Sequence, residues 1–84
     1  MGGELHISSL VVHVLPSKVQ AVHDAIGHFR GTEIHAVTVE GRMIVTVETK
    51  SEADFLKCFN EIDELTGVVS TALVFHQVET VGLG

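Results

Sequence analysis

The sequence predicts a single α+β domain whose elements follow the order β-α-β-β-α-β. Branched apolar residues crowd two stretches near the ends of the chain, 5–14 and 68–79, as is typical of strands. Two segments between them carry apolar residues at helical spacing. Gly41 and Arg42 separate two further strand-like runs, which indicates a hairpin at the centre of the chain.

Residues 5–14 are expected to form the first strand, which Pro16 ends. Ser17 and Gln20 fit a capping box, in which two backbone donors at the start of a helix are satisfied reciprocally. Apolar residues then recur at helical spacing and give this helix one stripe for burial: Val19, Val22, Ile26 and Phe29. Gly27 should weaken the helix by about 1 kcal/mol relative to alanine.

The middle of the chain is expected to form the hairpin. Gly31 suits the left-handed conformation that ends a helix, and residues 32–40 then form the second strand. The turn at Gly41-Arg42 leads into the third strand over 43–49. Because the connection is short, these two strands must be antiparallel neighbours.

Ser51 is expected to cap the second helix, with Asp54 at the third helical position. The buried stripe of this helix comprises Phe55, Cys58, Phe59, Ile62 and Leu65. Gly67 stops the helix, and the fourth strand follows. The single domain, 1–84, is expected to be ordered over about 5–79, with a loose tail at 80–84.

This order of elements predicts the ferredoxin-like split βαβ sandwich. Its four-stranded antiparallel sheet is expected to have the strand order 4-1-3-2, with both helices on one face. No further element remains to cover the other face. The residues on that face therefore bear on what the protein binds, because a large exposed apolar patch usually marks a partner site.

Alternation along the strands assigns side chains to the two faces of the sheet. The helix side receives Leu10, Val12, Val14, Met43, Val45 and Val47. In the fourth strand Leu73 and Phe75 are assigned to the helix side, and a one-residue bulge would reverse that choice. The uncovered face receives Ile7, Ser9, Val11, His13, Ile44, Thr46, Glu48, Ser70, Ala72, Val74 and His76. This face is therefore predicted to be a shallow apolar floor with small residues and an acidic rim.

Composition and motifs argue against several classes of function. A formal net charge of −6 with only five Lys and Arg argues against a nucleic-acid ligand. The six histidines lie in no local metal-ligand spacing, and Cys58 lies on a predicted apolar stripe, so no metal or cofactor is expected. No constellation of catalytic residues is found, and an enzyme is not expected. Without an apolar run of about 18 residues or a recognisable signal peptide, the expected compartment is the cytoplasm.

Ordered motifs along the chain resemble the NapD family, the cytoplasmic assembly chaperones of periplasmic nitrate reductase. The resemblance covers about residues 7–79. The matching pieces are Ser9-Leu10-Val11-Val12, Gly31-Thr32-Glu33, the run from Gly41 to Glu48, and the run from Gly67 to Glu79. One departure is Phe75, where the family usually has tyrosine before His-Gln, so a phenol hydrogen bond at this position cannot be essential here.

The resemblance implies a client and a role. Family members hold the twin-arginine signal peptide of the nitrate reductase catalytic subunit until its molybdenum cofactor and iron–sulfur cluster are installed, which prevents premature export. A helical signal peptide would lay an apolar stripe on the uncovered face and offer its arginines to Glu33, Glu48 or Glu79. The expected peptide-binding set is the uncovered-face residues given above together with Glu33, Gln77 and Glu79. Its apolar anchors are expected to be Val11, Ile44 and Val74.

Two other functions fit the same fold. A dimeric regulatory module would bind a small ligand between protomers, and its mass would depend on concentration. A metal-trafficking domain would need a Cys-x-x-Cys motif after the first strand, and that motif is missing. For a chaperone, the expected self-association is at most a weak homodimer.

Overall fold

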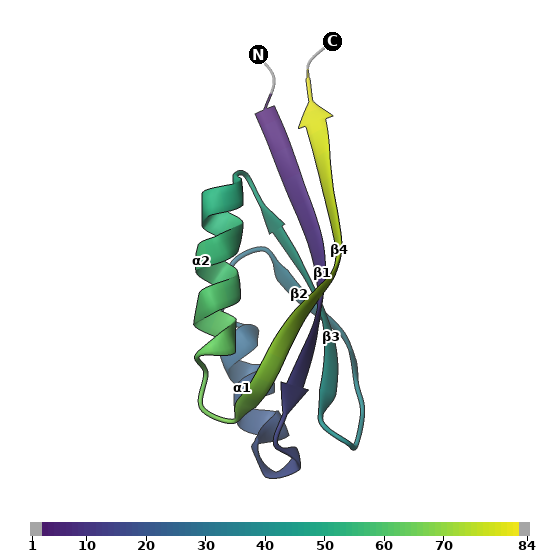
Figure 1. Ribbon diagram of the computed structural model, residues 1–84, viewed down its shortest axis with the longest axis vertical. Coiled ribbons are helices and arrows are strands. Elements are labelled where there is room, and N and C mark those ends of the chain that lie inside the picture. Colours follow the sequence, from purple (N-terminus) through teal and green to yellow (C-terminus); the bar gives the residue numbers. More distant parts are fainter. Residues whose placement is uncertain (1–2, 83–84) are drawn as a thin grey trace.

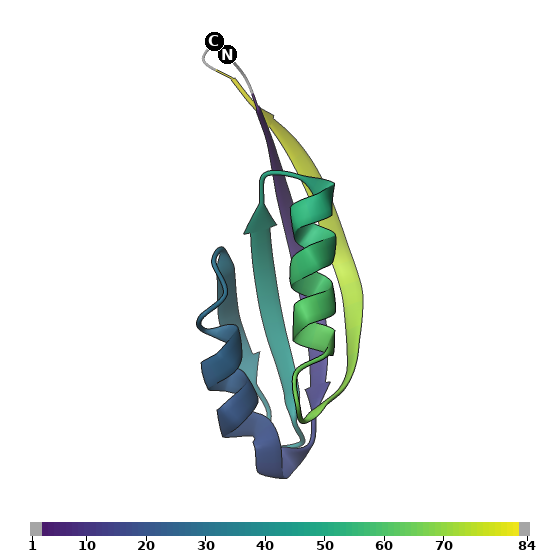
Figure 2. The same ribbon diagram turned by 90° about the vertical axis from the view of Figure 1, so that its left-hand side faces the viewer.

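The computed structural model describes residues 3–82 and confirms the predicted architecture. One antiparallel sheet has the order β2-β3-β1-β4, which is the predicted order read from the other edge. Its strands are β1 Gly3–Val14, β2 Thr32–Val37, β3 Arg42–Thr49 and β4 Val68–Val81. The helices α1 Val19–Ile26 and α2 Glu52–Asp63 both lie on one face of this sheet (Figure 2), and the opposite face is left uncovered (Figure 1).

The hydrophobic core lies between the sheet and the two helices. The assignment of the two central strands is confirmed, because Leu10 and Val12 of β1 and Met43, Val45 and Val47 of β3 are fully buried. Val22 and Ile26 of α1, and Phe55 and Ile62 of α2, close the core from the helix side. The alternation that buries these residues sends their neighbours on β1 and β3 to the other face.

The start of α1 differs from the prediction. Pro16 opens a 3-10 turn, η1 Pro16–Lys18, and neither this turn nor α1 has a side-chain cap. The predicted capping box is therefore wrong, and the amide of Gln20 instead donates to Asp24 Oδ1 at 2.9 Å. Proline fixes φ and removes one backbone donor, so the chain turns tightly at the point where Ser17 would have capped a helix. The cap of α2 is confirmed, because the Asp54 N–H donates to Ser51 Oγ at 3.1 Å.

The strands β1 and β4 are longer than predicted, and β2 is shorter. Gly3 pairs with Val81 and Glu4 with Thr80, so β1 and β4 extend together past the helices as a two-stranded ribbon (Figure 1). The expected tail is therefore wrong at residues 80–81, and residues 83–84 lie outside the described part of the chain. β2 ends at Val37, because the turn before β3 begins at Thr38, whose carbonyl accepts from the Gly41 N–H at 3.0 Å.

A β-bulge at Val74 reverses the side-chain alternation in the second half of β4. Leu73 pairs with Leu10 and Phe75 with Ser9, which leaves Val74 without a partner on β1. One extra residue shifts every later side chain to the other face. The assignments of Phe75 and His76 are therefore wrong: Phe75 shares the uncovered face with Ser9, and His76 shares the helix side with Ser8.

His76 takes part in a polar cluster between β1, β4 and α2. Its Nδ1 and Ser8 Oγ share a hydrogen bond of 2.7 Å. The His76 ring lies 5.6 Å from that of Phe55 and 5.5 Å from that of His6, measured between ring centroids. Ser8 is fully buried and His6 is only 7% exposed, whereas His76 is exposed, so the cluster links the interior to the surface at β4.

Replacing Ser8 with alanine should lower the free energy of unfolding by about 1 kcal/mol, because it removes the hydrogen bond between Ser8 Oγ and His76 Nδ1. Urea unfolding followed by circular dichroism measures this change. Ser9→Ala is the matched control on the uncovered face, and a change within about 0.5 kcal/mol is expected there. Equal losses in the two variants would show that the Ser8–His76 bond contributes nothing to stability.

Candidate functional site

The candidate site is the face of the sheet that the helices leave uncovered, here called the open face. Pairing between β1 and β3 places four pairs on it: Ile7–Glu48, Ser9–Thr46, Val11–Ile44 and His13–Arg42. β4 adds the residues opposite β1, which are Ser70, Ala72, Phe75, Gln77 and Glu79. β2 adds Glu33 opposite Thr46 and Ala36 opposite Ile44. Of the predicted site residues, the structure brings all but His76 and Val74 to this face.

The centre of the open face is an apolar patch. Val11 of β1 has Ile44 on one side and Ala72 on the other, and Phe75 lies one pair further along β4. Ile44 is 37% exposed and Phe75 is 51% exposed, although both are large apolar side chains on a sheet. Val74, the bulge residue, is 59% exposed beside Phe75 in the chain. A large apolar side chain that stays in water on a flat surface is available for burial by a partner.

Polar contacts surround the apolar patch. At one end of the face the Arg42 Nε–H donates to His13 Nε2 at 2.8 Å. On the β2 side, His35 Nε2 and Thr46 Oγ1 share a hydrogen bond of 2.8 Å, and Glu33 Oε2 lies 4.0 Å from the same nitrogen. At the far end the Gln77 amide donates to Glu79 Oε1 at 2.8 Å.

Sequence reasoning missed four residues of this face, namely Phe75, Arg42, His35 and Ala36. Phe75 was assigned to the wrong side because the bulge cannot be read from the chain. Arg42 was placed in the hairpin turn, yet it opens β3 and pairs with His13. Its position two residues before Ile44 was the available signal, since residues two apart in a strand share a face.

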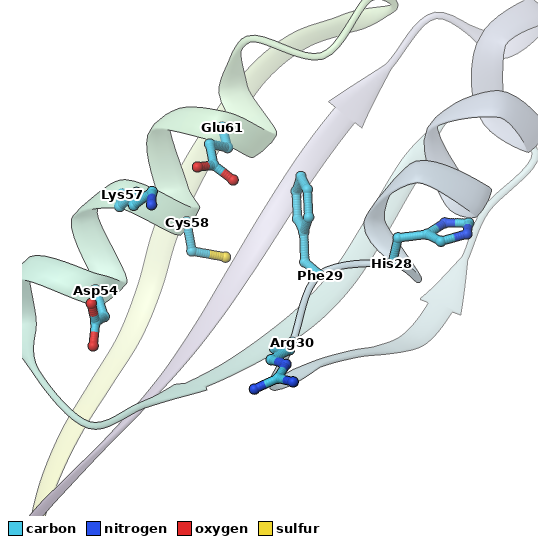
Figure 3. A pocket seen from close by; sticks show the side chains of 7 residues that line it. All are labelled: His28, Phe29, Arg30, Asp54, Lys57, Cys58 and Glu61. Atoms are coloured by element: carbon cyan, nitrogen blue, oxygen red, sulfur yellow. The ribbon is translucent and has the colours of Figure 1, made fainter.

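A separate cavity lies in the helix layer, between α2 and the segment that follows α1 (Figure 3). It has a volume of about 240 Å³ and is lined by His28, Phe29, Arg30, Asp54, Lys57, Cys58 and Glu61. Burial raises the pKa of the Cys58 thiol, and the nearby Glu61 carboxylate raises it further. The thiolate is the nucleophilic form of cysteine, so this protonated thiol is poorly suited to covalent chemistry. Cys58 packs against the core, as its place in the predicted stripe implied.

Alkylation of Cys58 by iodoacetamide at pH 8 should be several-fold slower in the folded protein than in the same chain unfolded in guanidinium chloride. The raised pKa leaves less thiolate in the folded state, and Glu61→Gln should speed the reaction by removing one cause of the shift. Because the unfolded thiol ionises first, this group should lower folding stability as pH rises above the thiol's unfolded pKa. Equal rates in the folded and unfolded chains would contradict the shift.

Metal-binding clusters and membrane-spanning helices would also bear on the class of site. Within residues 3–82, no group of three or more His, Cys, Asp and Glu side chains is placed to hold a metal ion. No helix in the same range has the length and apolar character needed to cross a membrane.

Comparison with known families connects this fold and face to one of them. Residues 5–80 match the family model described as NapD protein. The chain belongs to the NapD family. The family resemblance inferred from the ordered motifs is thereby confirmed.

Relatives and a solved structure agree with this NapD assignment. The chain is 32% identical over 80 residues to the Chaperone NapD of Paracoccus pantotrophus, and the match covers 92% of this chain and 70% of that protein. It is 26% identical over 77 residues to the Chaperone NapD of Escherichia coli strain K12, with 90% and 88% covered. The solution structure of the E. coli Tat proofreading chaperone protein NapD has the same fold, with a TM-score of 0.80 at 24% identity over 87% of this chain and 78% of that one. These matches favour a chaperone over the regulatory module.

Proposed function

We propose that this NapD protein is a cytoplasmic chaperone whose open face binds the twin-arginine signal peptide of the periplasmic nitrate reductase catalytic subunit. Binding would delay export until the cofactors of the client are installed, and the protein would act by binding alone. The observation that carries the proposal is an uncovered sheet face with exposed apolar side chains and acidic neighbours. The name of the E. coli relative, a Tat proofreading chaperone, supports a client of the twin-arginine pathway.

The apolar part of a signal peptide matches the centre of the open face. As a helix, the peptide presents one apolar stripe, and Val11, Ile44 and Phe75 offer a floor on which that stripe can lie. Phe75 joins the predicted anchors Val11 and Ile44 because the bulge turns its ring to this face, and Val74 lies beside it. Ala36 and Ala72, next to Ile44 and Val11, let a helix approach the sheet closely. A few such desolvated anchors would set the lifetime of the complex.

The arginines of the peptide match the acidic residues of the open face. Glu33, Glu48 and Glu79 are exposed and stand beside the apolar patch rather than within it. Exposed charge pairs of this kind chiefly raise the association rate and make it depend on salt. The planar guanidinium fork of arginine can meet a carboxylate with two hydrogen bonds, which lysine cannot do. His76 points to the helix side, so its proposed role is to support β4 rather than to contact the peptide.

Calorimetric titration of a synthetic twin-arginine signal peptide into the purified protein tests this proposal. Binding should weaken as salt is raised, and it should weaken further for a peptide in which both arginines are lysines. Light scattering of the free protein at several concentrations accompanies the titration, because a second copy of the sheet could occupy the same face. A mass that rises with concentration, together with no peptide binding at either salt, would reject the chaperone proposal in favour of the dimeric module.

A further inference from the structure

The charged side chains of the open face are segregated along β1. Glu79 stands level with Leu5, Glu48 with Ile7, and Glu33 with the row of Ser9 and Thr46. At the other end, Arg42 stands level with His13 and bonds to its ring. The apolar pair of Val11 and Ile44 lies between the two groups. The face is therefore acidic at one end, apolar in the middle and basic at the other end.

Three of the other cations gather where α2 meets the acidic end of the sheet. Arg30, Lys50 and Lys57 line a cavity of about 520 Å³ together with Glu48, Asp54 and Cys58. Lys18 ends η1, and its side chain lies against Gly67 beside Val22 of α1, on the helix side. Glu40 lies in the turn before Arg42, but within residues 3–82 Arg42 has no carboxylate oxygen within 4.0 Å. Arg42, at the opposite end of the face, is the one Lys or Arg that lies within the described strands.

The distance between the charged ends suits a helix of modest length. From Ile7 to His13 there are six residues along β1, which span about 20 Å at roughly 3.3 Å per residue. An α-helix rises 1.5 Å per residue, so about 13 helical residues cover the same distance. An apolar segment of that length can cross the patch while its basic leading segment stays at the acidic end.

We infer that the client peptide lies along β1 in a single orientation, with its arginines at the end marked by Glu48 and Glu79 and the C-terminal end of its apolar helix at Arg42 and His13. This inference rests on the proposed function. The partial negative charge at a helix C-terminus is stabilised by a nearby cation, which Arg42 supplies. The reverse orientation would bring the peptide's arginines to Arg42 and the negative helix end to Glu48, so both ends would be mismatched.

Contact quenching between one tryptophan on the peptide and one bimane label on the full chain tests the orientation. The chain contains no tryptophan or tyrosine, so the peptide is the sole source of quenching. In a Cys58→Ser background, Gln77→Cys places the label level with Ile7, near Glu48, and Ser70→Cys places it level with His13, near Arg42. A tryptophan just before the twin arginines should quench the label at position 77 several-fold more than the label at 70. A tryptophan at the end of the apolar segment should give the opposite pattern.

The experiment separates a failure of the proposed function from a failure of the inferred orientation. Calorimetry on the labelled variants first establishes that the peptide binds, and a failure of all variants and of the parent chain to bind rejects the proposed function itself. Binding with the reversed quenching pattern leaves the function standing and overturns the orientation. Binding with equal quenching at the two labels also overturns it, because the peptide would then lie both ways along β1.

Discussion

An Ile44→Asp variant should bind a twin-arginine signal peptide about 100-fold more weakly than the parent chain. Ile44 lies at the centre of the apolar patch, opposite Val11, where a bound helix would shield it from water. Burying a carboxylate without a partner costs several kcal/mol. Partial hydration of the carboxylate should reduce this cost to about 3 kcal/mol, which corresponds to a roughly 100-fold loss of affinity. The added negative charge would by itself attract a basic peptide, so a loss of affinity reports on burial of the patch. Titration calorimetry measures the effect.

Leu56→Asp is the matched control for that experiment. Leu56 is 48% exposed, comparable to Ile44 at 37%, but it lies on α2, on the other side of the sheet. The same charge introduced there should leave peptide affinity within about twofold of the parent, since an exposed charge away from the interface contributes little. Unchanged binding by Ile44→Asp would mean that the open face is not the peptide site. Equal losses in both variants would indicate damage to the fold.

The side-chain faces of the central strands β1 and β3 could be predicted because the alternation of their apolar residues is compatible with only one assignment. On β1 and β3 the residues on one parity are apolar throughout the central rows, and all of them are buried. A one-residue slip would expose Leu10, Val12 and Val45 together, so the register is strongly determined. The same argument fails for β4, whose apolar residues fall on both parities. Nothing in that stretch locates the extra residue at Val74, and Phe75 and His76 were placed on the wrong faces for this reason.

Local turn chemistry explains the other differences. Ser17 and Gln20 have the residue types of a capping box, but Pro16 starts a 3-10 turn before the helix, and that competing geometry prevails.

The ribbon formed by the ends of β1 and β4 carries few apolar residues that point to a core, so composition alone suggested a tail at 80–84. Pairing between distant ends of the chain orders this segment, and such pairing is not visible in a local pattern. The acidic residues of the open face could be predicted from the sequence. Arg42, which lies at the other end of this face, could not.

Replacing Gly41 with alanine should lower the free energy of unfolding by about 3 kcal/mol and the melting temperature by roughly 12–24 °C. Gly41 has φ of +97°, a conformation that other residues adopt only with strain. A Cβ at this position would run into the backbone oxygen of Val14. Relief of that contact would stretch the 2.7 Å bond in which the Val14 N–H donates to the Gly41 carbonyl, and the end of β1 would separate from the hairpin. Thermal unfolding followed by circular dichroism measures the loss.

Gly27→Ala supplies the control with the same chemical change. Gly27 ends α1 with φ of −60°, and an added Cβ would meet backbone oxygens at 3.4 and 3.5 Å, which are ordinary contacts. Alanine there should leave stability unchanged or raise it by about 0.5 kcal/mol, because it restricts the unfolded chain. At roughly 0.05–0.15 kcal/mol per residue, 84 residues give a total stability of only about 4–13 kcal/mol, so the Gly41 variant should lose a large part of it. If the two variants prove equally stable, the turn before β3 must adopt another conformation, and the position of Arg42 beside His13 would have to be revised with it.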